Sequence, residues 1–117
     1  MGSKTVFVFG SNEAGRHGAG SAKAALDEWG AKYGVGIGRQ GNSYAIPTKD
    51  ENIESLPLDV IQTYVDSFIQ YAERHPTITF QVVKIGCGLA GFTEDEIRPM
   101  FAKAPMNCVL PIGWRAA

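Results

Sequence analysis

Two glycine-rich segments, residues 10–20 and 86–92, constrain the fold more than any other feature of this sequence. Each follows a run of β-branched and aromatic residues, at residues 5–9 and 77–85, of the kind that forms strands buried on both faces. A helical pattern begins soon after each glycine-rich segment. This repeated order of strand, glycine loop and helix predicts an α/β domain.

Helical periodicity marks three segments. Residues 19–33, rich in alanine and lysine, are predicted to form a helix that ends at the following glycine. Apolar residues recur at helical spacing over residues 58–75, with Ser55 as a candidate cap and Pro57 in the first turn. A third helix is predicted to begin at Thr93, where Thr-Glu-Asp-Glu matches a capping box.

The remaining strands are shorter. Residues 34–41 indicate a small hairpin or an irregular ribbon that leads into a strand at residues 42–47, and residues 107–112 are predicted to form the last strand. Strands that alternate with helices imply right-handed crossovers. We therefore expect residues 1–117 to form a single three-layer α/β/α domain around a mainly parallel, mixed sheet.

The charge balance argues against a nucleic-acid polymer as partner. With 11 basic and 12 acidic residues and a formal net charge of -1, the chain lacks the positive field that draws proteins to nucleic-acid backbones. No apolar stretch approaches the roughly 20 residues of a membrane span, and residues 1–4 lack the apolar core of a secretion signal. We expect a cytoplasmic protein with no membrane partner.

The cysteines and histidines do not indicate a metal site. Cys87 and Cys108 lie far apart, and only His17 and His75 accompany them, so no zinc-like spacing occurs. Reduced thiols, no metal and no cofactor are expected. A small sheet has exposed edge strands through which two copies of the chain could pair, so a homodimer is a further expectation.

The two glycine loops are the predicted binding site, because ligands of open α/β sheets bind beyond the carboxyl ends of strands, where free N–H groups favour anions. Three acidic residues at the start of the third helix would repel an anion there, so a phosphate is expected at the 86–91 loop itself. We expect a phosphate-bearing, nucleotide-like ligand in contact with Gly10, Ser11, Asn12, Arg16, His17, Gly18, Ala19, Gly20, Ser21, Gly86, Cys87, Gly88, Leu89, Ala90, Gly91 and Phe92.

Other nucleotide motifs are excluded. The glycines at 36, 38 and 41 match a dinucleotide fingerprint by spacing, but they follow a predicted helix instead of preceding one. A Walker-type phosphate loop is absent because no Gly-Lys-Ser/Thr sequence occurs. The structural alternative for all these glycines is that they only permit tight turns.

Three short motifs occur in order along most of the chain: Gly18-Ala19-Gly20, Tyr-Ala-Ile-Pro-Thr-Lys at residues 44–49, and Ile-Gly-Cys-Gly-Leu at residues 85–89. Together they resemble the macro domain superfamily, in particular its terminal ADP-ribose glycohydrolase branch in a compact bacterial or phage form. The resemblance implies ADP-ribose or a relative as ligand, with Asn12 and residues 18–21 near the distal ribose and residues 86–91 around the diphosphate.

The same resemblance implies a catalytic role for Lys49. In that branch a lysine after the strand attacks the anomeric carbon of the ribose, and Lys49 occupies the matching place. The branch carries an acidic residue directly after Gly-Cys-Gly-Leu, where this sequence has Ala90. A lysine nucleophile needs a lowered pKa and a partner that moves protons, for which Asp50 and Glu13 are the remaining candidates.

The sequence is compatible with three functions. A binding module that senses or sequesters ADP-ribose-type or cyclic-nucleotide-type signals requires only the two loops, and the missing acid favours it. An ADP-ribosyl hydrolase using Lys49 is the alternative, and a protein-interaction domain with a degenerate pocket is the third. Arg16 and His17 could also be ordinary surface residues. Cys87 could be a nucleophile or a small buried residue at the end of a strand.

Overall fold

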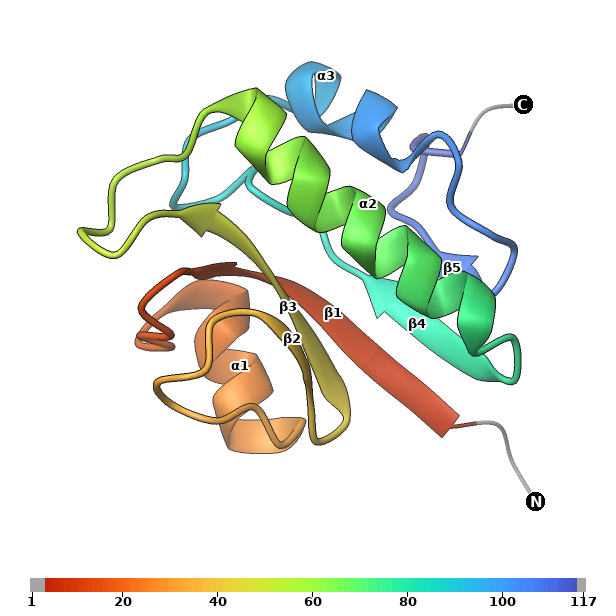
Figure 1. Cartoon of the computed structure of the whole chain (residues 1–117), viewed down its shortest axis with the longest axis horizontal. Coiled ribbons are helices and arrows are strands. Elements are labelled where there is room, and N and C mark those ends of the chain that lie inside the picture. The colour runs from red at the N-terminus through yellow and green to blue at the C-terminus, as the bar shows by residue number, and fades with distance from the viewer. Residues whose placement is uncertain (1–3, 116–117) are drawn as a thin grey trace.

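In a computed structural model of the chain, which describes residues 4–115, five strands form one sheet. They are β1 (Lys4–Asn12), β2 (Gly38–Gln40), β3 (Ser43–Lys49), β4 (Ile78–Val82) and β5 (Cys108–Val109), in the spatial order β2-β3-β1-β4-β5 (Figure 1). The central strand β1 runs parallel to β3 and β4, β5 is parallel to β4, and β2 is antiparallel to β3. The expected mainly parallel, mixed sheet is confirmed.

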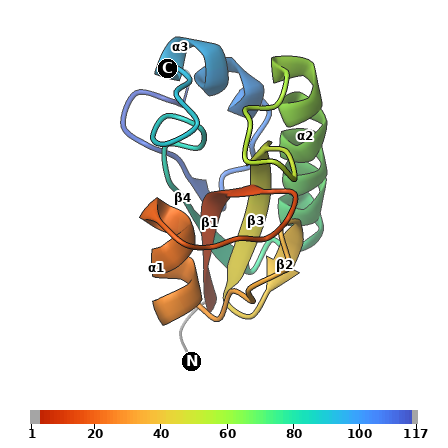
Figure 2. The ribbon, with the colours of Figure 1, turned by 90° about the vertical axis from the view of Figure 1, so that its left-hand side faces the viewer.

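Helices cover both faces of the sheet (Figure 2). Helix α1 (Gly20–Glu28) packs on one face, while α2 (Leu58–Arg74), α3 (Glu94–Ile97) and the 3-10 turn η1 (Arg98–Phe101) pack on the other. Side chains of β1 alternate between the two cores: Val6 and Val8 join the α2 side and Phe9 the α1 side. The predicted three-layer α/β/α fold is confirmed.

Helix α2 supplies most of the larger core. Its buried side chains Ile61, Val65, Phe68, Ile69 and Ala72 recur at three- and four-residue spacing, as the sequence predicted. None of the helices within residues 4–115 is long and apolar enough to cross a bilayer.

The first strand and the first helix differ from the sequence prediction. Strand β1 does not stop before Gly10, because Ser11 and Asn12 continue its pairing with β3. Helix α1 ends at Glu28 instead of running to residue 33, because Gly30 takes a positive φ of 79° that stops the helix. Residues 31–37 are thereby free to turn back behind the loop that follows β1.

The later boundaries also shift. Ser55 does not cap α2, whose N-cap position is Pro57, and the Ser55 hydroxyl instead donates to the carbonyl of Ala90, 2.8 Å away. Strand β4 ends at Val82, and β5 pairs over only two residues. The hairpin or ribbon expected within residues 34–41 contains the short strand β2, whose antiparallel partner is the following strand, β3. The Thr93 capping box is confirmed.

Candidate functional site

A cavity of about 650 Å³ lies where the chain leaves the carboxyl ends of β1, β3 and β4. The carboxyl ends of all three strands lie at the left-hand side of the molecule in Figure 1, and this side faces the viewer in Figure 2. The volume falls within the range of small-molecule sites, about 300–1,000 Å³. Its walls are Gly10, Ser11, Asn12, Arg16, Gly18, Ala19, Gly20, Ser21, Ala22, Thr48, Lys49, Ile53, Val83, Lys84, Gly86, Cys87, Gly88, Leu89 and Ala90.

The structure brings the two predicted loops together around this cavity. All but three of the predicted ligand-contacting residues line it, and Lys49 does too. Residues His17, Gly91 and Phe92 do not line it. Five further residues line the cavity that the sequence patterns did not indicate: Ala22, Thr48, Ile53, Val83 and Lys84. Ala22 and Thr48 adjoin predicted site residues in the sequence, and Lys84 lies two residues before Gly86, so these three could have been found from their sequence positions. Ile53 lies in a segment with no glycine motif.

His17 is buried, although its place in a polar glycine loop suggested contact with a ligand. Its side chain is 0% exposed, its Nε2 lies 2.9 Å from the carbonyl oxygen of Val35, and its ring packs edge-on against Phe9. The imidazole therefore connects the first loop to the segment behind it instead of facing the cavity.

Asn12 shapes the first loop from within. Its side-chain amide donates to the carbonyl of Arg16 at 3.0 Å, and its Oδ1 accepts the backbone N–H of Arg16 at 2.9 Å. These paired bonds close the turn and place Arg16 at the rim of the cavity with an exposed side chain.

Residues 31–37 support the first loop from behind. The hydroxyl of Ser11 donates to the carbonyl of Gly36, and the N–H of Gly34 donates to the carbonyl of Gly15 at 2.8 Å. A Cβ on Gly36 would overlap the carbonyl oxygen of Asn12, so this glycine serves close backbone packing. Gly38 and Gly41 have positive φ angles of 85° and 58°, so all three glycines of the dinucleotide-like spacing have a structural explanation.

The start of α1 faces the cavity with no internal cap. Its N-cap residue, Ala19, makes no side-chain capping bond, and the first turn carries no acidic residue. Ala19, Gly20, Ser21 and Ala22 all line the cavity. Free N–H groups and the positive end of the helix dipole favour an anion there. In contrast, α3 is closed by its capping box and carries three acids in its first turn.

The second loop is a tight turn closed by its own backbone. The N–H of Phe92 donates to the carbonyl of Gly86 at 2.9 Å, and the N–H of Gly91 donates to that of Gly88 at 3.0 Å. Phe92 packs against the larger core, which explains why it does not line the cavity. The loop therefore presents Gly86, Cys87, Gly88, Leu89 and Ala90 to the cavity.

At two positions on the cavity wall, neither the backbone conformation nor the packing requires a glycine. Neither Gly18 nor Gly88 has a positive φ, and a Cβ built on either would meet no other part of the described chain within 4 Å. Both positions border open space in the cavity. Glycine at these positions is typical of sites where a ligand approaches the backbone closely.

The cavity wall carries three basic side chains, Arg16, Lys49 and Lys84, and no carboxylate. Lys84 is held at the rim by Glu94, with Nζ 3.2 Å from Oε2, and Trp114 donates to the other oxygen of this carboxylate at 2.8 Å. The hydrogen bond from Trp114, followed by that from Lys84, lowers the pKa of Glu94. Glu94 offsets the charge of Lys84, whereas Arg16 and Lys49 form no salt bridge within residues 4–115 and favour an anionic ligand.

Neither candidate acid for Lys49 reaches the cavity wall. The carboxylate of Glu13 accepts a hydrogen bond of 2.5 Å from the hydroxyl of Tyr64 on α2. The Oδ1 of Asp50 accepts the backbone N–H groups of Asn52 and Glu54 and thereby closes a turn. Ala90, which also lines the cavity, has no titratable side chain. The described site therefore holds Lys49 without a neighbouring general acid or base on the wall.

Cys87 is poorly suited to nucleophilic catalysis. Burial raises the pKa of its thiol, the charges of Glu94 and Glu96 raise it further, and Lys84 opposes them. A thiol that stays protonated near neutral pH is a weak nucleophile. Within residues 4–115, the structure also shows no cluster of three or more histidine, cysteine, aspartate or glutamate side chains placed to hold a metal ion.

The bond between Tyr64 and Glu13 predicts a pH effect on stability. Its hydrogen bond to Glu13 raises the pKa of Tyr64 to about 12, with burial adding to the shift. A group whose folded pKa is raised stabilises the fold below its unfolded pKa of about 10 and loses this contribution as the pH rises toward 12. Tyr64→Phe should therefore show a smaller loss of stability between pH 9.5 and about 11.5, measured as urea midpoints. Identical pH profiles for the two proteins would contradict this assignment.

Comparison with known proteins bears on the fold. No protein-family model matches the sequence, and no curated protein matches it significantly. Two similar structures are proteins from Bacteroides thetaiotaomicron, one of them described as of unknown function. They have TM-scores of 0.66 and 0.61 and identities of 13% and 14%, and the alignments cover 94% of this chain and 88% and 90% of theirs. A macrodomain protein from Streptomyces coelicolor has a TM-score of 0.59 at 14% identity, over 97% of this chain and 91% of its own. The chain therefore has a macrodomain-like α/β/α fold.

Proposed function

We propose that this protein binds ADP-ribose, or a related nucleotide with a diphosphate, in the cavity between its two glycine loops. The observation that carries the proposal is a 650 Å³ cavity whose walls combine three basic side chains, no carboxylate and the uncapped start of α1. The diphosphate would lie against the N–H groups of residues 18–22 and 86–90. Binding without turnover would suit a protein that senses or sequesters a nucleotide signal.

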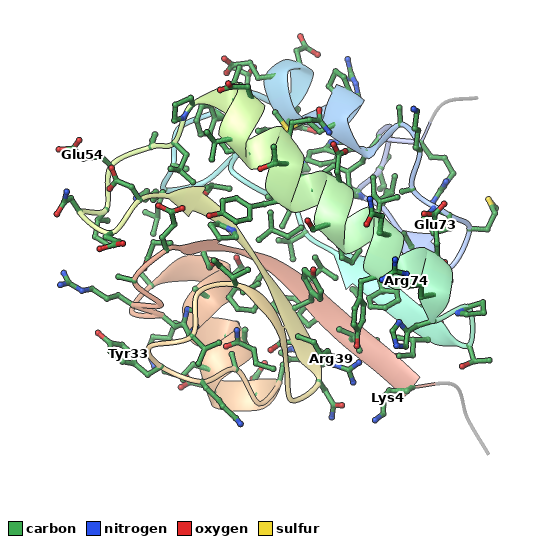
Figure 3. The ribbon with its side chains drawn as sticks, viewed as in Figure 1. Lys4, Tyr33, Arg39, Glu54, Glu73 and Arg74 are labelled. Carbon is green, nitrogen blue, oxygen red and sulfur yellow. The ribbon has the colours of Figure 1, made fainter. Side chains whose placement is uncertain are left out.

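Titration calorimetry with ADP-ribose tests the proposal directly. The unaltered protein is expected to bind one equivalent, and Arg16→Ala to bind about fivefold more weakly because an exposed charge contact contributes about 1 kcal/mol. Arg74→Ala is the matched control, since this exposed arginine ends α2 at the opposite end of the molecule (Figure 3). Absence of heat with ADP-ribose and with cyclic nucleotides would reject the proposal in favour of a protein-interaction domain.

The second candidate is an ADP-ribosyl hydrolase, supported by the position of Lys49 on the cavity wall. Incubation with ADP-ribosylated protein distinguishes it from a binding module. Release of ADP-ribose by the unaltered protein but not by Lys49→Ala would establish catalysis. Tight binding with no release is expected instead, because the wall has no carboxylate to move protons for the lysine.

A further inference from the structure

The strained residue of this structure lies on the wall of the cavity. Ile53 has a φ of 62°, and it is the sole non-glycine residue with positive φ within residues 4–115. A left-handed backbone costs an L-residue roughly 1–2 kcal/mol, and a β-branched residue there is an outlier. Glycine or asparagine would occupy this position with less strain.

The surrounding loop fixes this conformation. The N–H of Ile53 donates to the carbonyl of Asp50 at 3.1 Å, and the N–H of Asp50 donates to the carbonyl of Glu54 at 2.7 Å. The Asp50 carboxylate accepts two further N–H groups of the same turn. Glu54 marks the tip of this loop beyond β3 in Figure 3. These contacts explain the turn, but they involve backbone atoms of Ile53 and give no reason for an isoleucine side chain.

The Ile53 side chain is directed to the cavity instead of the core. It is 36% exposed, lines the cavity and belongs to neither hydrophobic core. Leu89, 71% exposed, is the other large exposed apolar side chain on the wall. The loops that carry these two residues are joined by the hydrogen bond from Ser55 to Ala90. The cavity wall thus contains two exposed apolar side chains in addition to its three basic ones.

We propose that Ile53 is a specificity residue that contacts an uncharged ring of the ligand, either a sugar or a base. This inference rests on the proposed function, in which the glycine loops hold the phosphates. Strained backbone conformations that the surrounding structure holds in place cluster at active sites and ligand-binding sites. Here the side chain would be retained because ligand binding removes its exposed apolar surface from water.

The test compares Ile53→Asn, which tolerates a positive φ, with Ile53→Val, which keeps an apolar β-branched side chain. Ile53→Asn is expected to bind ADP-ribose about tenfold more weakly, while Ile53→Val stays within about twofold. Inorganic pyrophosphate, which has no ring, should bind both variants and the unaltered protein alike. The matched control Ile112→Asn alters an isoleucine that is 99% exposed and does not line the cavity.

Melting temperatures complete the test. Ile53→Asn should melt no lower than the unaltered protein, because the substitution relieves strain without emptying a core. A fall of more than about 4 °C, or an equal loss of affinity for ADP-ribose and pyrophosphate, would show a structural role and overturn the inference. Undiminished binding of ADP-ribose by Ile53→Asn would overturn it while leaving the proposed function intact. Failure of the unaltered protein to bind ADP-ribose would overturn both.

Discussion

Replacing Gly88 with leucine is expected to weaken binding of ADP-ribose at least about a hundredfold, which corresponds to about 2.7 kcal/mol. The physical reason is that Gly88 lines the cavity and has open space where its side chain would be. A leucine there would fill the volume that the diphosphate needs and would hold it away from the loop N–H groups. Calorimetry with ADP-ribose measures the effect.

The same substitution should leave the fold intact. Gly88 has no positive φ and no neighbour within 4 Å of a Cβ in the described chain, so the melting temperature should change by less than about 3 °C. Ala102→Leu is the matched control, because Ala102 is exposed and does not line the cavity. Full affinity in Gly88→Leu would mean that the ligand does not approach this loop.

The second large effect is on stability. Gly36→Ala should lower the free energy of unfolding by about 3 kcal/mol, because overpacking a rigid site costs 1–3 kcal/mol and sometimes more. A Cβ on Gly36 would overlap the carbonyl oxygen of Asn12 and lie 3.0 Å from the backbone nitrogen of Gly15. Backbone atoms on both sides cannot move aside without displacing the first loop. Urea unfolding at neutral pH measures the loss.

A matched glycine separates this steric effect from the general effect of an added methyl group. Gly18 lies in the same loop after β1, but a Cβ there would meet nothing within 4 Å. Gly18→Ala should therefore change the free energy of unfolding by less than about 0.5 kcal/mol. Equal stability losses in Gly36→Ala and Gly18→Ala would contradict the packing described for residues 31–37.

The sequence predicted the fold where local patterns and burial agree. The alternating apolar residues of β1 face two cores, so a buried central strand was recognisable before its partners were known. The apolar stripe of α2 and the Thr93 capping box are likewise local patterns, and both appear as predicted. Boundaries were less predictable: Ser11 and Asn12 extend β1 because β3 supplies partners there, which no local pattern indicates.

What the sequence by itself determined is the pair of glycine loops and their place after central strands, because β-branched runs and glycines act locally. Only the tertiary structure decided which side chains of those loops reach the cavity. It turned His17 inward against Phe9, and it brought Ile53 to the wall from another segment. Side-chain direction in a loop depends on the segments packed behind it, and residues 31–37 pack there after α1 has ended before a glycine of positive φ.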